Sequence, residues 1–250
     1  MKICVFDTET TSLEKPFCYN VGFIIYDTET AETLAREEYV TEQIWHNMEL
    51  FSSAYYTEKR PFYVNSMRAR KISLEKWGYI TQRMRRLFKL YNVECAFAYN
   101  SNFDEKVFDF NCDWFKTQNP FDSVPILDIR GYFHHFIAFT PEYKKFCDEN
   151  SLYTESGHYS TTAEAGFRFI SKDNDFIEAH TALADAEIEL QILLNTACKG
   201  AVIGNVYNAY RSIKREQEKV LTICDRTGEQ YKFEYKEIRI NKDKTEIKLK

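Results

Sequence analysis

The chain opens with three strand-like segments joined by short turns, and this opening constrains the fold more than any other feature. Residues 2–6 are almost wholly apolar, as are residues 19–27, and such runs are typical of strands buried on both faces. Residues 33–41 follow the turn-like Thr28-Glu29-Thr30 and mix polar with apolar side chains, as a partly exposed strand does. We therefore expect a β-meander at the start of the fold.

Helix-like and strand-like segments alternate after the meander. Apolar residues recur at helical spacing from Leu74 to Tyr91, and the strand-like residues 95–99 follow at once. Asn102 is suited to cap a short helix over residues 103–111, with Glu105 three residues later. The other predicted elements are a strand over 125–128 and helices near 142–149, 161–170, 182–198 and 204–219. This order predicts an α/β fold.

The last part of the chain alternates apolar and polar residues in short segments, which predicts a small antiparallel β appendage. The segments are residues 221–224, 231–235, 238–240 and 247–249. We expect one main domain over residues 1–198 and a helix-and-β appendage over residues 199–250. The appendage has two readings, one as a docking or self-association module and one as a flap that stabilises the fold.

Charge and cysteine content restrict the class of protein. The 33 basic and 38 acidic residues give a formal charge of -5, which excludes a uniformly basic protein that coats nucleic acid. The seven cysteines are odd in number and never spaced Cys-x-x-Cys, which indicates a reducing compartment. No segment resembles an export signal or a membrane span. We expect a cytoplasmic protein without a membrane partner.

Two acids, Asp7 and Glu9, end the first predicted strand. Residues two apart on a strand point to the same face, so both carboxylates can reach one divalent cation such as Mg²⁺ or Mn²⁺. The spacing alone is weak evidence, since Asp-x-Glu also occurs at Asp27 and at Asp185. Asp27 enters the turn between the second and third strands, where acidic residues are ordinary turn formers.

Two later segments add further candidates. Asp104 lies at the start of a helix just after a core strand, and His180 and Asp185 lie around the start of the helix predicted over 182–198. Taken singly, each acid could do no more than complement a helix dipole, and His180 could be an ordinary loop histidine. On one helix His180 and Asp185 would point about 140° apart, so we expect His180 on the loop before it.

Together these segments resemble the three ordered motifs of the DEDDh-type (DnaQ-like) 3'-to-5' exonucleases, which include the epsilon proofreading subunits of bacterial DNA polymerase. The motifs are Asp7-x-Glu9-Thr10-Thr11, Asn100-x-x-Phe103-Asp104 and His180-x-Ala182-x-x-Asp185-Ala186. The resemblance spans residues 1–198, and Ser12 stands where many members have Gly. It implies a ribonuclease H-like fold, with a mixed five-stranded sheet and flanking helices.

The resemblance also implies a mechanism with two Mg²⁺ or Mn²⁺ ions, one activating a water and the other stabilising the leaving 3' oxygen. By similarity, Asp7 bridges both ions, Glu9 and Asp185 complete one ion site, and Asp104 holds the second ion through water. His180 is the implied general base, a role that suits an imidazole with its ordinary pKa near 6.5.

Substrate contacts are expected beside these motifs. The resemblance places Thr10 and Leu13 against the terminal nucleotide, with Asn100 and Phe103 lining the same pocket, although Phe103 could equally be a core aromatic. Residues 59–89 hold ten basic residues and one acid. We interpret residues 59–71, with Phe62 and Tyr63, as a basic aromatic loop that suits single-stranded nucleic acid, and the later arginines as a solvated helix face.

These observations predict a metal-dependent 3'-to-5' exonuclease that releases nucleoside monophosphates from single-stranded DNA. The alternatives are an exoribonuclease of the same family and a catalytically silent nucleic-acid-binding subunit. The partner is left open between none and a DNA polymerase or replisome component in proofreading and DNA replication. The source is expected to be bacterial, or a phage acting in its host's cytoplasm.

Overall fold

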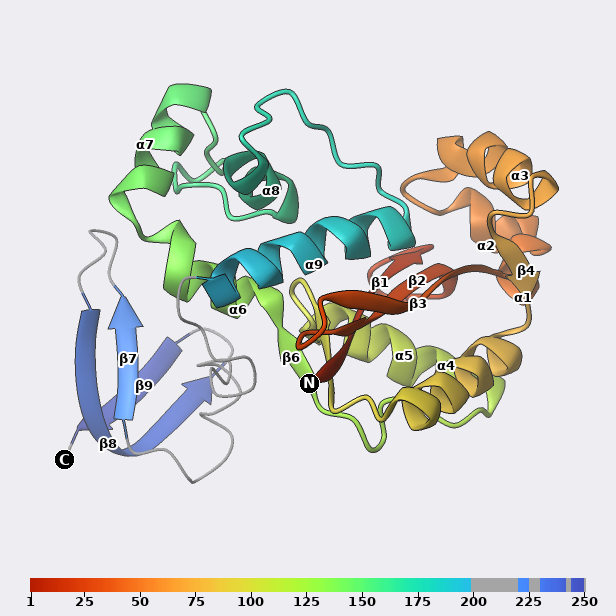
Figure 1. Cartoon of the computed structure of the whole chain (residues 1–250), viewed down its shortest axis with the longest axis horizontal. Coiled ribbons are helices and arrows are strands. Elements are labelled where there is room, and N and C mark those ends of the chain that lie inside the picture. Colours follow the sequence, from red (N-terminus) through yellow and green to blue (C-terminus); the bar gives the residue numbers. More distant parts are fainter. Residues whose placement is uncertain (199–219, 225–229, 242–243, 250) are drawn as a thin grey trace. The chain divides into compact units, whose positions relative to one another are not determined.

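The computed structural model describes residues 1–198, 220–224, 230–241 and 244–249. The chain divides into two compact units (Figure 1). The first comprises residues 1–129 and 176–191, and the second comprises residues 130–175 and 192–250. The four acids and the histidine singled out above all belong to the first unit.

A six-stranded mixed sheet forms the centre of the first unit, in the order β4-β3-β2-β1-β5-β6. The meander pairs antiparallel as predicted, whereas β5 and β6 run parallel to β1, and β4 runs parallel to β3. The bounds are β1 Lys2–Thr10, β2 Cys18–Asp27, β3 Glu32–Thr41, β4 Ser73–Glu75, β5 Cys95–Ala98 and β6 Ile126–Asp128. The predicted α/β class, with a mixed sheet and flanking helices, is thereby confirmed.

The sheet has one strand more than the five expected. The additional strand is β4, whose three residues are too few to show the alternation that marks a strand in a sequence. Its middle residue, Leu74, was assigned to the start of a helix, but that helix, α4, spans Trp77–Tyr91. Similarly, α5 spans Asn102–Phe115, so Ser101 rather than Asn102 is its N-cap.

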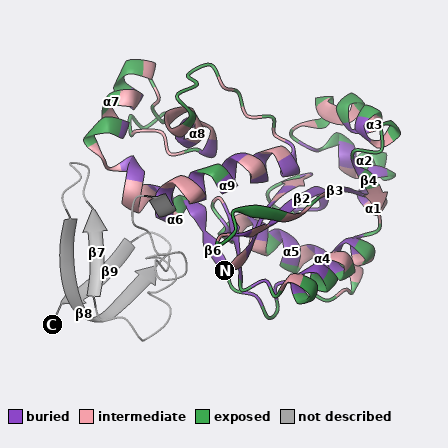
Figure 2. Cartoon of the chain, in the orientation of Figure 1, coloured by how far each residue is buried: buried purple, intermediate pink, exposed green. Residues whose placement is uncertain are grey.

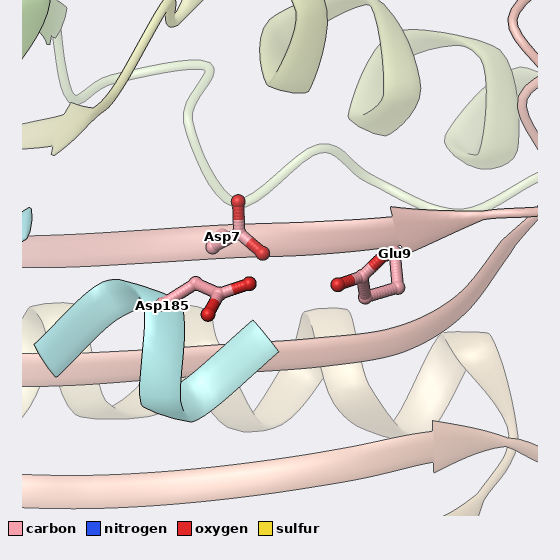
Figure 3. Close-up of side chains that lie close together, drawn as sticks. All are labelled: Asp7, Glu9 and Asp185. Atoms are coloured by element: carbon pink, nitrogen blue, oxygen red, sulfur yellow. The ribbon is translucent and has the colours of Figure 1, made fainter. Parts of the chain in front are cut away.

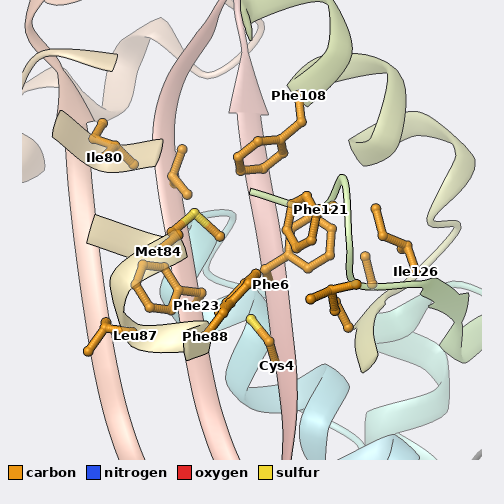
Figure 4. Close-up of a cluster of buried hydrophobic side chains, with 14 of the residues drawn as sticks. Cys4, Phe6, Phe23, Ile80, Met84, Leu87, Phe88, Phe108, Phe121 and Ile126 are labelled. Atoms are coloured by element: carbon orange, nitrogen blue, oxygen red, sulfur yellow. The ribbon is translucent and has the colours of Figure 1, made fainter. Parts of the chain in front are cut away.

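Alternation along β1 separates the core from the acidic side of the sheet. Cys4 and Phe6 point into a hydrophobic cluster formed with α4 and α5, where Phe6 stacks on Phe121 at a ring-centroid distance of 4.4 Å (Figure 4). The helix α9 (Ala182–Cys198) covers the opposite face of the sheet (Figure 1). Figure 2 shows the exposed residues of α4 on its outer side. Residues of odd number at the end of β1 therefore face α9.

The first turn of α9 lies directly against β2 at Gly22. A Cβ on Gly22 would lie 2.1 Å from the backbone nitrogen of Leu183 and 2.4 Å from the carbonyl carbon of Ala182. The Ala182 N–H donates to the Asn20 side-chain oxygen at 2.9 Å, which anchors the helix start to the same strand. Since Gly22 pairs with Asp7 in the sheet, this contact places α9 beside the end of β1.

Residues 42–68 form four short helices over the edge of the first unit: α1 Glu42–Trp45, α2 Met48–Ser52, η1 Thr57–Lys59 and α3 Arg60–Arg68. They pack through an aromatic cluster in which Tyr63 is fully buried among Tyr19, Trp45 and Phe51. The prediction that residues 59–71 form a basic aromatic loop is therefore wrong, because residues 60–68 are helical. Tyr63 supplies packing and cannot stack on a base, whereas Phe62 is about half exposed.

The second unit contains helices and a separate sheet. The helical elements are α6 Ile129–Phe133, the π-helical turn η2 His134–Ala138, α7 Pro141–Asn150 and α8 Ala163–Ser171. The predicted antiparallel appendage is confirmed as β7 Val220–Cys224, β8 Gln230–Asn241 and β9 Lys244–Leu249. Residues 231–235 and 238–240 form one strand instead of two, because a register shift after Tyr235 lets β8 continue.

The helix predicted over residues 204–219 lies outside the described residues. None of the helices in the described part of the chain combines the length and the apolar character that crossing a bilayer requires. All five cysteines whose side chains are described are unpaired thiols.

Candidate active site

Three carboxylates meet where β1 ends against the first turn of α9. Asp7 and Glu9 project from β1, and Asp185 projects toward them from α9 (Figure 3). One oxygen from each acid lies within 4.8 Å of the others. The two segments are about 180 residues apart in the sequence, and the contact of α9 with Gly22 brings them together. This spacing suits three ligands of a single cation.

Burial and mutual repulsion make it unfavourable for all three carboxylates to be ionised at the same time. Burial, followed by repulsion from Asp185, raises the pKa of Glu9 to about 9. Burial and then Glu178 raise the pKa of Asp185 to about 8, and burial and then Asp104 raise the pKa of Asp7 well above its ordinary range. A divalent cation would remove this repulsion by pairing with the ionised carboxylates.

One oxygen of the cluster shows that the site suits a positively charged ligand. Asp185 is buried, and its Oδ1 has no hydrogen-bond partner among the described residues. A buried carboxylate oxygen without a partner is costly unless it coordinates a metal or is paired. The hard oxygen donors of Asp7, Glu9 and Asp185 match the preference of Mg²⁺ and Mn²⁺, so the residues present fit such an ion.

Asp104 is near Asp7 but is not one of the three acids whose oxygens lie within 4.8 Å of one another. It is buried in the first turn of α5 and accepts a 2.7 Å hydrogen bond from the Thr8 hydroxyl. Burial raises the pKa of Asp104 to about 7, although the Thr8 hydrogen bond favours its ionised form. Asp104 therefore contributes negative charge toward Asp7 from α5.

Two acids that sequence reasoning missed hold the turn before α5. The Tyr99 N–H donates to Glu189 Oε2 at 3.2 Å, and the Asn100 N–H donates to Asp128 Oδ1 at 2.9 Å. Asn100 has a left-handed backbone with φ of 61°. Glu189 lies four residues after Asp185 on α9, so both side chains share one face of the helix. This spacing is the sequence signal that could have identified Glu189.

His180 lies on the loop before α9, as the angular argument requires. Its backbone is also left-handed, with φ of 48°. The His180 ring stacks on Tyr56, with ring centroids 4.5 Å apart and an interplanar angle of 13°. Glu178 Oε2 lies 3.8 Å from His180 Nδ1, close enough to stabilise a protonated imidazole.

The fold of this chain is similar to that of several solved 3'-exonuclease structures. The nuclease domain of 3'hExo, a DEDDh family member bound to rAMP, has a TM-score of 0.51 and 13% identity, covering 80% of this chain and 92% of that one. A 3'-exonuclease recognising a histone mRNA stem-loop has a TM-score of 0.57 and 15% identity, covering 80% and 82%. The fold is that of the DEDDh 3'-exonucleases.

A third similar structure is a complex with an oligonucleotide. E. coli exonuclease I in complex with a dA16 oligonucleotide has a TM-score of 0.53 and 18% identity, covering 87% of this chain. The match covers 44% of exonuclease I, so this chain spans less than half of that enzyme's length. No family model matches the sequence, and no curated protein matches it either.

The four residues predicted to contact substrate lie in different surroundings. Thr10 is partly exposed at the end of β1, and Leu13 in the following loop is 83% exposed. Asn100 is exposed, whereas Phe103 packs against the hydrophobic cluster under α4 and α5. Phe103 therefore packs against the core, as in the alternative interpretation that it is a core aromatic residue. Its role in a pocket stays a prediction, as do those of the other three.

The second copy of the Asp-x-Glu pattern lies away from the three-acid cluster. Asp27 ends β2 and accepts a hydrogen bond from the Glu29 N–H at 3.0 Å, as turn-forming acids do. Its other oxygen lies 3.4 Å from the Lys2 ammonium. These contacts agree with the interpretation of Asp27 as a turn residue.

Proposed function

We propose that this protein is a metal-dependent 3'-to-5' exonuclease that hydrolyses single-stranded DNA to nucleoside monophosphates. The observation that carries the proposal is the cluster of Asp7, Glu9 and Asp185 at the end of a central strand, in which the buried Asp185 Oδ1 has no hydrogen-bond partner among the described residues. The fold shared with DEDDh 3'-exonucleases supports the same reaction class.

The metal would be held by acids from three elements. Asp7, Glu9 and Asp185 would hold one Mg²⁺ or Mn²⁺, and Asp104 would act with Asp7 toward a second ion. When bound, such ions lower the pKa of a water and neutralise negative charge on the phosphate and the leaving oxygen. Asp104 and Asp185 are buried and Asp7 and Glu9 are partly buried, which limits the access of competing water to the carboxylates.

His180 would take the proton of the attacking water. Imidazole is suited to proton transfer near neutral pH, and the Glu178 carboxylate would stabilise the imidazolium that forms. The left-handed backbone at His180 turns the chain just before α9, so the base and Asp185 share one end of the sheet.

DNA is our first choice of substrate and RNA the alternative. The solved neighbours include complexes with dA16 and with rAMP, so the fold accommodates both chemistries. Exposed basic residues in and after α3, namely Arg68, Arg70 and Lys71, support contact with single-stranded phosphates. Association with a DNA polymerase or replisome component in proofreading, as for the epsilon subunits, is a further part of this proposal.

The competing proposal is a catalytically silent nucleic-acid-binding subunit. Such a subunit predicts the loss of at least one ligand position, but Asp7, Glu9, Asp104, His180 and Asp185 are all present. The direct test is to incubate 3'-labelled and 5'-labelled DNA and RNA 16-mers with the protein and Mg²⁺ or Mn²⁺. We expect stepwise shortening from the 3' end, with DNA cleaved faster.

Asp7→Asn should abolish this shortening, and Asp27→Asn is the matched control because it changes the same tetrapeptide outside the cluster. An Asp27→Asn protein should cleave at the wild-type rate. The proposed exonuclease activity would be refuted if the wild-type protein left both DNA and RNA oligonucleotides intact, or if Asp7→Asn retained cleavage.

A further inference from the structure

Tyr56 stacks on the ring of His180. The two rings are nearly parallel, at 13°, and their centroids lie 4.5 Å apart. Tyr56 is partly buried between η1 and the loop that precedes α9. A stacked ring restricts an imidazole to a narrow range of orientations, because leaving the stack exposes both faces to water.

Lys59 holds the backbone of the same loop. Its ammonium donates to the carbonyl oxygens of Ala179 and His180, the latter at 3.3 Å. The same ammonium lies 4.9 Å from the centroid of the Tyr56 ring. Side chain and backbone of His180 are thus held by two residues three positions apart on one segment.

His180 needs such support because its backbone is unfavourable. A φ of 48° is uncommon for a residue other than glycine and persists only when the surroundings determine it. The supporting segment is itself well anchored, since Phe51 and Ala54 before it and Tyr63 after it are buried. Arg60 adds a contact over the Trp45 ring, 4.2 Å from its centroid.

We propose that Tyr56 and Lys59 are positioning residues that hold His180 in the orientation from which it accepts the water's proton. This inference rests on the proposed exonuclease activity and assigns a specific task to Tyr56, the N-cap of η1, and to Lys59, its last residue. It differs from the nucleic-acid contact expected for this segment, because the partner of both side chains is the protein's own loop.

The first test is kinetic. Tyr56→Leu and Lys59→Met should lower kcat by roughly 10- to 100-fold, as expected when a catalytic group is misplaced, with KM for the oligonucleotide unchanged. Tyr56→Phe keeps the ring and should retain most of the activity. Tyr153→Leu and Lys145→Met change exposed residues of the second unit and should match the wild type. Thermal unfolding checks that each variant is folded.

The second test asks whether Tyr56 acts through His180. In single-turnover measurements on His180→Ala, adding Tyr56→Leu should cause no further loss, since the base that Tyr56 orients is absent. An equal fractional loss in both backgrounds would overturn the inference. So would a larger KM with unchanged kcat, which would make Tyr56 a substrate-binding residue.

The third test does not depend on activity. The stacked Tyr56 ring should shift the His180 imidazole proton resonances upfield, and these signals are identified by their absence from His180→Ala. Tyr56→Leu should remove the upfield shift, and Tyr56→Phe should keep it. An inactive wild type would refute the exonuclease activity itself. An active wild type, together with a fully active Tyr56→Leu whose His180 resonances match those of the wild type, would refute only the positioning role.

Discussion

The acids at the end of β1 illustrate how burial turns ordinary residues into a site. Glu9 and Asp185 are common acids on common elements, but their shared surroundings raise the pKa of each far above its ordinary value. Such shifts cluster at functional sites because the same burial that disfavours a lone charge strengthens the attraction for a cation. The raised pKa values of Glu9 and Asp185 therefore predict that stability depends on pH.

Without metal, the protein should lose stability as pH rises. The folded pKa values of about 9 for Glu9 and about 8 for Asp185 exceed those of the unfolded chain, so the folded state binds more protons. The free energy of unfolding then falls from about pH 4, the ordinary acid range, up to pH 9. Unfolding midpoints in EDTA should drop between pH 6 and pH 9.

Two controls belong to this measurement. Mg²⁺ should restore the midpoint more at pH 9 than at pH 6, because more carboxylates are then ionised and available. Glu9→Gln cannot ionise at this position, so its midpoint should depend less on pH. An unchanged slope for Glu9→Gln would contradict the assignment of the pH dependence to this cluster.

At the scale of elements, Gly22 determines how closely α9 approaches the sheet. Gly22→Ala places a methyl group 2.1 Å from the Leu183 backbone nitrogen, so the first turn of α9 must move away from β1. We expect a loss of about 1–3 kcal/mol in the free energy of unfolding, as for overpacked cores, together with a loss of nuclease activity.

Gly78→Ala is the matched substitution. Gly78 lies in α4, and the nearest atom to a new Cβ is the Thr117 methyl at 3.4 Å. Since alanine favours helix, this variant should gain up to about 1 kcal/mol and keep its activity. Denaturant unfolding and oligonucleotide cleavage measure both variants, and similar results for the two would show that α9 does not need the glycine.

The turn between β5 and α5 is held by a hydrogen bond to Glu189 on α9. Glu189→Ala leaves the Tyr99 N–H without its acceptor, which should cost about 1–3 kcal/mol and shift Asp104 through α5. Glu189→Gln keeps an acceptor at the same position and should retain both stability and cleavage. If Glu189→Gln loses as much activity as Glu189→Ala, the charge of Glu189 matters more than the turn.

For the whole molecule, the uneven distribution of charge should govern substrate binding. The segment 59–89 carries a formal charge of +9 from ten basic residues and one acid, against -5 for the whole chain. Binding of single strands through n phosphate contacts weakens with salt, with a slope of about 0.7 per contact. An Asp7→Asn protein allows binding to be measured without cleavage.

In this background, Arg70→Ala with Lys71→Ala should lower the salt slope for single-stranded DNA by about 1.4. Both residues are exposed just beyond α3. Arg86→Ala with Lys89→Ala removes the same charge from the exposed face of α4 and should leave the slope unchanged. Fluorescence anisotropy at 50–200 mM salt measures both, and equal losses would indicate a general effect of net charge.

The sequence was sufficient to predict most of the longer elements and the order of the motifs, because both depend on spacing over a few residues. Apolar runs and alternation identified the meander, and helical spacing identified α4 and α9. The three-residue β4 and the helical structure of residues 60–68 were missed, since short elements carry little periodic signal.

The motifs predicted that Asp7, Glu9 and Asp185 share a site, but the contacts that bring such distant residues together are visible in the tertiary structure alone. Asp7 and Asp185 come together because Gly22 allows α9 to rest on β2, and the Tyr56–His180 stack joins residues more than 120 positions apart. The same packing leaves Asp185 Oδ1 without a hydrogen-bond partner in the described part of the chain and forms the hydrogen bond from Tyr99 to Glu189. Local patterns do not record such contacts, because they depend on how elements far apart in the chain cross in three dimensions.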